Sequence, residues 1–416
     1  MHSSNTLFSH GRDVLNTIAD APNPKPAHSD KKGFGSLASL YTAFSKDFGS
    51  FAIEKMRDFG HKRILDPFAG MGTLGEAGRS FDIELELNDL NPFAFLACKV
   101  RTAGKDVCLE ALKILNAAVK IESIADPEPY KNVCLNLLAM SKKETKDIFA
   151  AEQTEEDTYI ALAIFIVCIA RIKRYKSKTG TNPTWTRKIS EIDIPPELFI
   201  ATLEEAKSLF IEYSDKLPER HRKFSIKVSR ADVKHICPPD KYDAIITSPP
   251  YPNRIDYYKH YLPATALLAE LLGLNERSLR LSQIGTPLIR EIDEIKKLSP
   301  NTDRLIETIK SHDSYASNSY YWKGFYYYFS DMSSFFGRAW KTLSPGGNLI
   351  FVVQDTFYKD VPVPVSDLLS ELAIIHGFSV VDDVRWEVPV RLSTMSPHVK
   401  YRRARKPREV AVLLSK

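Results

Sequence analysis

Apolar and polar positions along this chain group into short apolar runs that are separated by longer stretches of helical pattern. Seven of the runs are rich in Val, Ile, Leu or Phe and predict strands. They cover residues 63–66, 83–89, 224–229, 243–248, 348–354, 378–388 and 409–415. Several are apolar at consecutive positions, which is typical of strands covered by helices on both faces. The pattern therefore predicts an α/β protein with a largely parallel sheet.

Two long segments interrupt the strands. Residues 109–222 are rich in Leu, Ala, Lys and Glu and predict a helical insertion, whereas residues 274–318 are charged and irregular. The apolar run at 159–172 is too short to cross a bilayer comfortably and predicts a buried helix. We expect an exposed, mobile leader at 1–36 and three core segments at 37–108, 223–273 and 319–416. Insertions at 109–222 and 274–318 separate the core segments.

Composition adds limits to this picture. A chain of 416 residues with 44% hydrophobic and 26% charged residues is an ordinary globular protein. Its five cysteines form no Cys-x-x-Cys pair, which favours reduced thiols in the cytoplasm over a disulfide framework or a zinc site. The start of the chain lacks an apolar signal segment, the histidines show no ligand spacing, and neither a membrane nor a metal is expected. The net charge of +5 is too modest to name a partner.

A glycine-rich turn follows the first predicted strand. In "DPFAGMGTLGEAG", Gly70, Gly72 and Gly75 match G-x-G-x-x-G, and Asp89 follows at the end of the next strand. Glycines at this place let the backbone approach a ligand closely, and the acid can accept hydrogen bonds from ribose hydroxyls. A nucleotide-like ligand is expected, and NAD is one candidate. Asp66 directly before the turn would repel a phosphate but suits the amino group of a methionine moiety, which favours S-adenosylmethionine.

A second turn, "SPPY" at Ser248–Tyr251, follows the strand at 243–248. Two successive prolines fix the backbone, and in an open α/β sheet ligands bind beyond the carboxyl ends of the strands. A serine hydroxyl and a proline carbonyl can together accept both hydrogens of a planar amino group, and a tyrosine ring can stack on the base that carries it. Such a preformed turn suits catalysis, because little conformational freedom is lost at reaction.

These motifs resemble the amino-group DNA methyltransferases, and among them the cytosine-N4 type. "DPFAGMGT" looks like their cofactor motif, "TSPPY" like their catalytic motif, and the stretches 88–102 and 342–355 like their second- and fifth-strand regions. The resemblance covers most of the predicted core but not the helical insertion. It implies a Rossmann-like, seven-stranded, mostly parallel sheet with a reversed last hairpin, S-adenosylmethionine as cofactor, and DNA as substrate, with a cognate restriction or defence partner left open.

The resemblance also implies roles for individual residues. Its catalytic set is Ser248, Pro249, Pro250 and Tyr251, with Ser248 and the Pro249 carbonyl holding the amine and Tyr251 stacking on a flipped base. Its cofactor set is Asp66, Phe68, Gly70 and Gly72 on the methionine side, Asp89 at the ribose, Asp232 at the adenine amino group, and Tyr41 in a loosely matching N-terminal motif.

A flipped base needs a basic surface around the pocket, because phosphate contacts hold the nucleic acid. The stretch "KYRRARKPR" at 400–408 supplies such charges, and Arg254 and Tyr257 follow the catalytic turn. We expect DNA contacts from Arg254, Tyr257, Arg402, Arg403, Arg405 and Lys406. The helical insertion is the expected site of sequence recognition, with 274–318 as the runner-up. In the aromatic run at 320–336, helical spacing predicts that Phe325, Tyr328, Phe329, Met332 and Phe336 face the core.

Four other functions stay open at this point. Adenine N6 in DNA requires the same chemistry with a different pocket shape, and an RNA base is a further alternative. An NAD-dependent oxidoreductase would leave the Ser-Pro-Pro-Tyr turn unexplained. A non-catalytic nucleic-acid-binding module predicts decay at Asp66, Gly70, Ser248 or Tyr251, and all four are present.

Overall fold

The structure is a computed structural model. It describes residues 17–25, 34–38, 44–124, 126–150, 153–179, 195–217, 221–235, 241–252, 256–291, 294–388 and 406–416.

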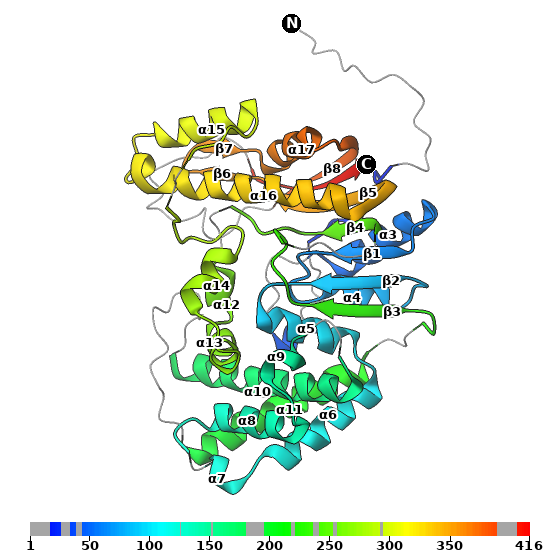
Figure 1. Cartoon of the computed structure of the whole chain (residues 1–416), viewed down its shortest axis with the longest axis vertical. Helices are drawn as coiled ribbons and strands as arrows, with labels where there is room; N and C mark the ends of the chain where they lie inside the picture. Colours follow the sequence, from blue (N-terminus) through cyan, green and yellow to red (C-terminus); the bar gives the residue numbers. More distant parts are fainter. Residues whose placement is uncertain are drawn as a thin grey trace, which may run out of the picture.

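A seven-stranded sheet in the order β3-β2-β1-β4-β5-β9-β8 forms the centre of the molecule (Figure 1). Its strands are β1 (Arg63–Asp66), β2 (Glu84–Asn88), β3 (Ser225–Ser229), β4 (Tyr242–Thr247), β5 (Leu343–Gln354), β8 (Ser379–Glu387) and β9 (Arg408–Ser415). The first five are parallel, whereas β9 runs antiparallel to both β5 and β8. All seven predicted strands are present, and the expected Rossmann-like sheet with a reversed last hairpin is confirmed.

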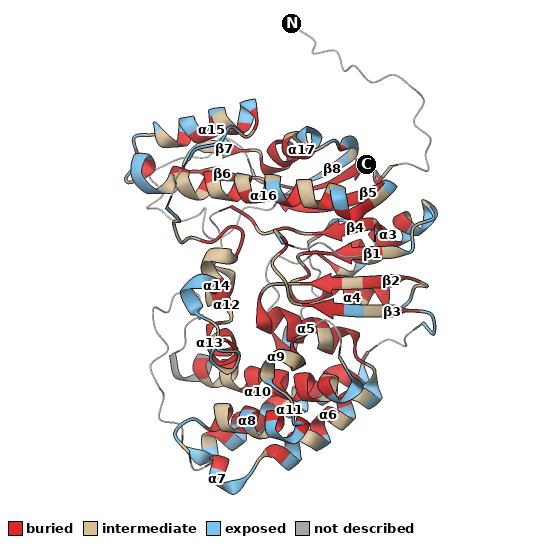
Figure 2. Cartoon of the chain, in the orientation of Figure 1, coloured by how far each residue is buried: buried red, intermediate tan, exposed pale blue. Residues whose placement is uncertain are grey.

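Alternate residues of the central strands enter two separate cores. In β5, Ile350 and Val352 join the core on one face, while Leu349, Phe351 and Val353 join the core on the other. This explains the continuous apolar runs in the sequence, since both faces of each central strand are covered. Figure 2 accordingly shows most of the central strands as buried.

Helices cover both faces of the sheet. The first core includes residues from α3 (Lys46–Asp58), α4 (Thr73–Gly78) and α5 (Pro92–Thr102). The second core includes residues from α15 (Pro300–Lys310), α16 (Trp322–Thr342) and α17 (Val365–Ile375). The predicted inward face of α16 is confirmed, because Phe325, Tyr328, Phe329, Met332 and Phe336 are all buried.

The predicted helical insertion forms a bundle beside α5, at the lower end of Figure 1. Its helices are α6 (Lys105–Ala118), α7 (Ile121–Ile124), α8 (Pro129–Ser141), α9 (Thr145–Ile148), α10 (Glu155–Thr179) and α11 (Pro196–Asp215). The long helix α10 is the central one: it packs on α5, α6, α8 and α11 and contains the apolar run at 159–172, whose residues 160–170 are all buried. At the two ends of the bundle, Lys105 Nζ lies 2.7 Å from Asp215 Oδ1.

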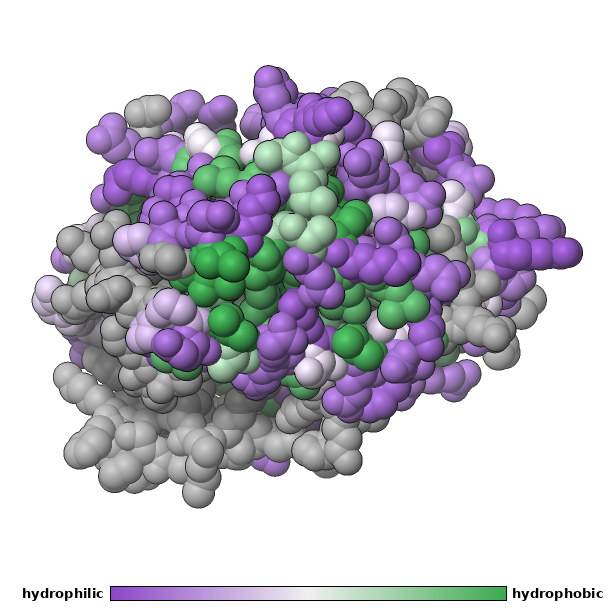
Figure 3. All heavy atoms as spheres, turned by 90° about the horizontal axis from the view of Figure 1, so that it is seen from below, coloured by the Kyte–Doolittle hydropathy of each residue, from purple (hydrophilic) through white to green (hydrophobic). Residues whose placement is uncertain are grey.

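The outer face of this bundle carries apolar side chains among polar ones. Seen from below, apolar atoms gather near the middle of the surface (Figure 3). Exposed large apolar residues of the bundle are Leu109, Ile121, Leu135, Met140, Ile200 and Ile211.

The region after β4 is more regular than the sequence predicts. It contains α12 (Tyr257–His260), α13 (Leu262–Leu271), α14 (Glu276–Ser282) and a π-helical turn, η3 (Ser317–Tyr321), before α16. Both α14 and α15 fall inside the segment expected to be irregular. After β5 comes a small hairpin of β6 (Thr356–Tyr358) and β7 (Val361–Val363), which the sequence analysis missed because each strand has three residues.

The described parts of the predicted leader pack on the core. Ile18 and Phe34 are buried, Phe34 lying in the short helix α2 (Phe34–Leu37), and the Ile18 amide donates to Asp382 on β8 at 2.9 Å. Within the described ranges, no helix combines the length and the apolar character needed to span a bilayer.

Candidate active site

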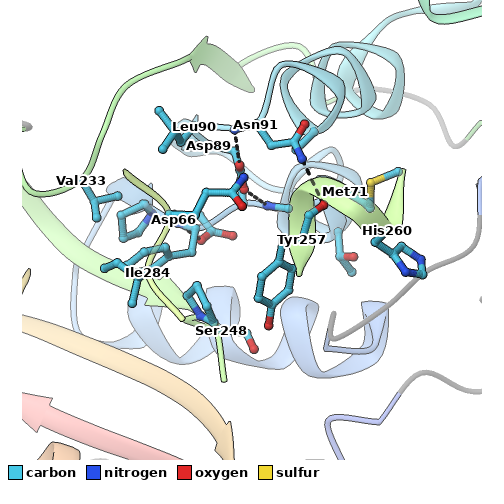
Figure 4. A pocket seen from close by; sticks show the side chains of 18 of the residues that line it. Asp66, Met71, Asp89, Leu90, Asn91, Val233, Ser248, Tyr257, His260 and Ile284 are labelled. Atoms are coloured by element: carbon cyan, nitrogen blue, oxygen red, sulfur yellow. Dashed lines mark hydrogen bonds between the residues drawn. The ribbon is translucent and has the colours of Figure 1, made fainter. Parts of the chain in front are cut away.

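A cavity lies at the carboxyl ends of β1, β2, β3 and β4 and encloses about 1050 Å³ of empty space, its open mouth included (Figure 4). The glycine turn after β1 and the Ser-Pro-Pro-Tyr turn after β4 both contribute to its wall. Its polar lining residues are Asp66, Thr73, Asp89, Asn91, Asp232, Ser248, Tyr257, His260, Tyr261, Ser282 and Gln283. Two motifs that are almost 180 residues apart in the chain therefore meet at one site.

The glycine turn is tied to the end of β2 through Asp89. The Gly70 amide donates to Asp89 Oδ2 at 2.9 Å, and the Asn91 amide donates to Asp89 Oδ1 at 2.8 Å. Gly72 has φ +77, and a Cβ atom there would lie 2.9 Å from Cys98 Cα. Gly70 lines the cavity, whereas Gly72 lies behind it and lets the turn pack on α5. Glycine is required at position 72 for both reasons.

Asp66 ends β1 inside the cavity. Its Oδ1 accepts hydrogen bonds from Thr247 Oγ1 at 2.7 Å and from the Phe68 amide at 3.2 Å. Burial raises the pKa of Asp66 to about 7; the two hydrogen bonds act against this rise, and the nearby Asp89 charge adds to it. Burial likewise raises the pKa of Asp89 to about 6. Both carboxyls therefore lie in an environment in which a cationic ligand would stabilise the ionised form.

Asn88 holds three loops together beneath the cavity, and the sequence analysis missed it. Its Nδ2 donates to the carbonyls of Pro67 at 3.2 Å and Ala231 at 3.0 Å, and its Oδ1 accepts from the Ala231 amide at 2.9 Å. It is fully buried. A polar residue at the end of a buried strand was the only available signal, because its partners come from two other strand ends.

The charged side chains among the described lining residues are all acidic. Among the described residues that line the cavity, Asp66, Asp89 and Asp232 are acidic, and none is Lys or Arg. Lys234 lies nearby, with its Nζ 3.6 Å from Asp232 Oδ2. This lining suits a ligand with a positive charge and hydroxyl or amino donors, and it disfavours a pyrophosphate.

The Ser-Pro-Pro-Tyr turn presents two of its four residues to the cavity. Ser248 and Pro250 line it, whereas Pro249 and Tyr251 are buried and do not. The Ser248 hydroxyl donates to the Val352 carbonyl at 3.1 Å, which leaves the oxygen lone pairs as acceptors. The Tyr251 hydroxyl donates to Glu409 Oε1 at 2.8 Å. Burial, and then the Glu409 charge, raise the pKa of Tyr251.

Tyr257 lies between the two halves of the site. It lines the cavity, and its hydroxyl accepts from the Tyr251 amide at 3.1 Å. Its own carbonyl accepts from Asn91 Nδ2 at 3.4 Å, one of the dashed lines in Figure 4. Tyr257 thus couples the loop after β2 to the Ser-Pro-Pro-Tyr turn. His260 follows on the same short helix and also lines the cavity.

A strap after α14, residues 282–291, closes one side of the cavity and was not predicted. Ser282, Gln283 and Ile284 line the site, and Lys234 Nζ donates to the Ser282 carbonyl at 3.0 Å. Gly285 has φ +76, and a Cβ there would lie 2.9 Å from the Tyr251 carbonyl. The strap therefore packs directly on the Ser-Pro-Pro-Tyr turn.

The remaining predicted residues have mixed placements. Phe68 and Asp232 line the cavity. Tyr41, Arg254, Arg402, Arg403 and Arg405 lie outside the described residues. Lys406 is described, and its Nζ lies 3.4 Å from Glu387 Oε2. Within the described ranges, no group of three or more His, Cys, Asp or Glu residues could hold a metal ion.

The strand pairing locates the ends of the basic segment before β9. Glu409 pairs with Gln354, the last residue of β5, and Arg408 pairs with Glu387, the last residue of β8. The carboxyl end of β5 is the edge at which the cavity opens, because β5 is parallel to β4. The segment that joins β8 to β9 therefore starts and ends at the cavity edge of the sheet, which the sequence pattern alone left undecided.

The chain is similar to two named methyltransferases, and no protein-family model matches it. It is 22% identical over 398 residues to the Type II methyltransferase M.BsoBI of Geobacillus stearothermophilus, covering 80% of this chain and 77% of that protein. It is 24% identical over 399 residues to the Type II methyltransferase M.AvaI of Nostoc sp. and of Anabaena variabilis, covering 81% of this chain and 77% of each.

Among solved structures, the chain matches the rRNA methyltransferase AviRa from Streptomyces viridochromogenes, with 10% identity, 94% of both chains covered and a TM-score of 0.28. A superposition of this quality supports no inference. The sequence similarity over four fifths of the chain is the comparison that bears on function: the chain is similar to Type II methyltransferases through most of its length.

Proposed function

We propose that this protein is a DNA methyltransferase that transfers a methyl group from S-adenosylmethionine to an exocyclic amine of a flipped base, namely N4 of cytosine. The observation that carries the proposal is the meeting of the Asp66–Gly70 turn and the Ser248–Pro250 turn in one acidic cavity. Similarity to Type II methyltransferases supports DNA as the substrate and a restriction–modification setting.

The acidic side chains that line the cavity fit the cofactor. Asp66 would hold the positively charged methionine end, Asp89 the ribose hydroxyls and Asp232 the adenine amino group. The absence of Lys and Arg from the described lining favours this ligand over NAD, whose pyrophosphate requires donors. When bound, S-adenosylmethionine supplies an electrophilic methyl group that an amine can attack without a covalent enzyme intermediate.

The catalytic turn fits a planar amino group. Because the Ser248 hydroxyl hydrogen is directed at the Val352 carbonyl, its oxygen can accept a hydrogen bond from the amine. The resemblance assigns the second hydrogen bond to the Pro249 carbonyl, although Pro249 does not line the cavity in this structure. Accepting both hydrogens holds the amine in one orientation and raises electron density on its nitrogen. Ser248 contributes no charge, so a neutral amine is held without an added ion.

Tyr257, rather than Tyr251, is proposed as the ring that contacts the flipped base. Tyr251 is buried, and its hydroxyl is engaged by Glu409, whereas Tyr257 lines the cavity next to Ser248. Tyr251 is then a positioning residue that fixes the turn. The basic segment between β8 and β9 is proposed to contact DNA phosphates, supported by the start and end of that segment at the cavity edge.

Nucleoside analysis tests the proposal. DNA from a host that expresses the protein is digested to nucleosides and compared by mass with DNA from a host that expresses Ser248→Ala. New N4-methylcytosine only with the wild type supports the proposal. New N6-methyladenine would show that the target base is adenine instead of cytosine. Methylation confined to RNA, or none despite folded protein, would overturn it. Binding of S-adenosylmethionine without transfer would favour a non-catalytic module.

A further inference from the structure

Two exposed tyrosines lie at and just before the start of the aromatic run at 320–336. Tyr315 is 91% exposed, and Tyr320 is 42% exposed, both just before α16. We define the aromatic patch as Tyr315, Tyr320, Tyr321 and Trp322 together with the lysines whose ammonium groups lie over their rings, Lys310, Lys323 and Lys359. Trp322 is buried in the core and Tyr321 packs against it, whereas the exposed rings of Tyr315 and Tyr320 are not among the core residues.

Tyr315 stands on a firmly held loop. Ser314 Oγ lies 2.7 Å from Ser317 Oγ and 3.0 Å from Tyr358 Oη, so three buried hydroxyls hold the loop from both sides. Ala316 has φ +59, a left-handed conformation that is unfavourable for a residue with a Cβ. The π-helical turn η3 follows at once, and such turns are rare and frequent at functional sites. The loop thus presents Tyr315 to solvent at a conformational cost.

Lysine ammonium groups lie over two rings of the patch, Trp322 and Tyr321. Lys310 Nζ lies 5.2 Å and Lys323 Nζ 6.0 Å from the Trp322 ring centroid, and Lys359 Nζ lies 5.7 Å from that of Tyr321. Exposed aromatic rings next to lysines are the combination that single-stranded or unstacked nucleic acid uses, with bases on the rings and phosphates near the cations.

The acidic residues beside the patch have a basic neighbour of their own. Asp313 lies 3.4 Å from His312 Nδ1, and Asp360 lies 2.9 Å from His312 Nε2. Both carboxylates therefore lie next to one imidazole.

One ring of the patch is connected to the strap that lines the cavity. Tyr320 Oη donates to the Pro287 carbonyl at 2.6 Å, and Pro287 is three residues beyond Ile284, which lines the cavity. Three residues span at most about 10 Å of chain. The hairpin that carries Lys359 follows the carboxyl end of β5, on the same edge of the sheet (Figure 1). A DNA strand that delivers a base to the cavity would pass this surface.

We propose that the aromatic patch binds the substrate DNA beside the target base, with Tyr315 stacking on an unstacked base and the three lysines lying against phosphates. This inference rests on the proposed function for the identity of the nucleic acid. Charge and continuity with the cavity favour DNA over a protein partner, since a purely apolar docking surface would not need the three lysines that lie over Tyr321 and Trp322 beside the exposed tyrosines.

DNA binding by the full-length chain tests the patch. Affinity for a fluorescein-labelled duplex of mixed sequence is measured by anisotropy for wild type, Tyr315→Ala and Tyr315→Trp. Loss of the ring is expected to weaken binding about tenfold, and Tyr315→Trp should restore it, because stacking tolerates any aromatic ring. Lys323→Ala should lower the slope of log Kd against log salt by about 0.9. In transfer assays, Tyr315→Ala should raise the KM for DNA more than it lowers kcat.

Ile375→Ala is the matched control, because Ile375 is 57% exposed at the end of α17, outside the aromatic patch and outside the segments expected to contact DNA. Its DNA affinity should equal that of the wild type. If Tyr315→Ala also binds DNA as the wild type does, the patch is not a DNA surface; a loss of self-association or protein capture with normal DNA binding would show a protein-docking face instead. If Tyr315→Ala loses DNA affinity while the wild type transfers no methyl group, the patch stands and the proposed function fails.

Discussion

The Tyr251 hydroxyl donates a 2.8 Å hydrogen bond to Glu409 Oε1, and this bond joins the Ser-Pro-Pro-Tyr turn to the first residues of the last strand. Both side chains are buried. Because β9 lies beside β5 in the sheet, the turn after β4 is braced from two strands away. The position of Ser248 in the cavity therefore depends on a residue near the end of the chain.

Tyr251→Phe should loosen this brace. Removing one partner of a buried hydrogen bond costs about 1–3 kcal/mol, so the free energy of unfolding should fall by that amount in denaturant titrations. Turnover should fall more than affinity for S-adenosylmethionine, because Tyr251 supports the Ser-Pro-Pro-Tyr turn and does not itself line the cavity. Glu409→Gln, which keeps an acceptor, is the control and should lose less stability. Equal stability of Tyr251→Phe and wild type would contradict the brace.

Affinity for S-adenosylmethionine should rise with pH through the neutral range. The pKa of Asp66 is raised to about 7 and that of Asp89 to about 6, chiefly by burial. A cationic ligand binds the ionised carboxylates best, so the dissociation constant measured by calorimetry should fall from pH 6 to pH 8. Asp66→Asn should bind S-adenosylmethionine more weakly and show a flatter pH dependence. An unchanged pH dependence would show that Asp66 does not hold the cofactor.

The same carboxyls make the ligand-free protein less stable as pH rises. Their pKa values in the folded chain lie above the ordinary value of 3.8, so the folded chain keeps protons that the unfolded chain has released. The contribution to the free energy of unfolding is therefore greatest below about pH 4 and is lost as pH rises toward 7. Asp66→Asn should reduce this decline in thermal unfolding between those limits.

Gly70→Ala and Gly72→Ala should have different effects. Both glycines have a positive φ, +51 at Gly70 and +77 at Gly72, and such a conformation costs a residue with a Cβ about 1–3 kcal/mol at either position. Only at Gly72 would the Cβ also clash, at 2.9 Å from Cys98 Cα, whereas at Gly70 its nearest contact is the Phe68 carbonyl at 4.0 Å. Gly72→Ala should therefore mainly lower the denaturation midpoint, and Gly70→Ala should mainly weaken cofactor binding. The reverse order would contradict the placement of the two glycines.

The buried ion pair of Arg101 and Glu76 should stabilise the glycine turn. Arg101 Nη2 lies 2.7 Å from Glu76 Oε2, and its Nη1 donates to Thr73 Oγ1 at 2.9 Å and to the Met71 carbonyl at 3.3 Å. Burial alone would raise the pKa of Glu76, but Arg101 and Lys46 bring it below its ordinary value. The stabilisation is therefore present above pH 4.5 and is lost as pH falls below it.

Glu76→Gln should cost about 3 kcal/mol of unfolding free energy, because it leaves a buried guanidinium without its counter-charge. Glu110→Gln, which breaks the exposed Lys113–Glu110 pair, should change it by less than about 1 kcal/mol. Urea titrations of both variants at neutral pH measure the difference. Similar losses of unfolding free energy in the two variants would show that burial of the Arg101–Glu76 pair does not increase its contribution to stability.

The strands and the two turns were predictable because their signals are local. A strand covered on both faces is apolar at consecutive positions, as in Ile350–Val353, and parallel strands bring their carboxyl ends to one edge. Asp66 and Ser248 could be expected to meet for that reason alone.

The orientation of Tyr251 was not predictable, because it depends on Glu409, 158 residues away in sequence. The strap around Gln283 has no periodic pattern of apolar residues that would predict its structure. Its position follows from long-range contacts: the hydroxyls of Tyr320 and Tyr327 donate to the carbonyls of Pro287 and Arg290. Such contacts follow only from the folded arrangement of α16.

The ion pair between Lys105 and Asp215 means that the chain departs from the sheet and comes back at one point, so strand β3 can dock beside β2 whatever length of polypeptide lies between them. Yet the excursion is not dispensable: Phe165 on α10 stacks on Phe93 of α5, with centroids 5.4 Å apart. A shortened chain that joined the two ends directly would remove this cover from Phe93, so the bundle forms one wall of the core beside α5.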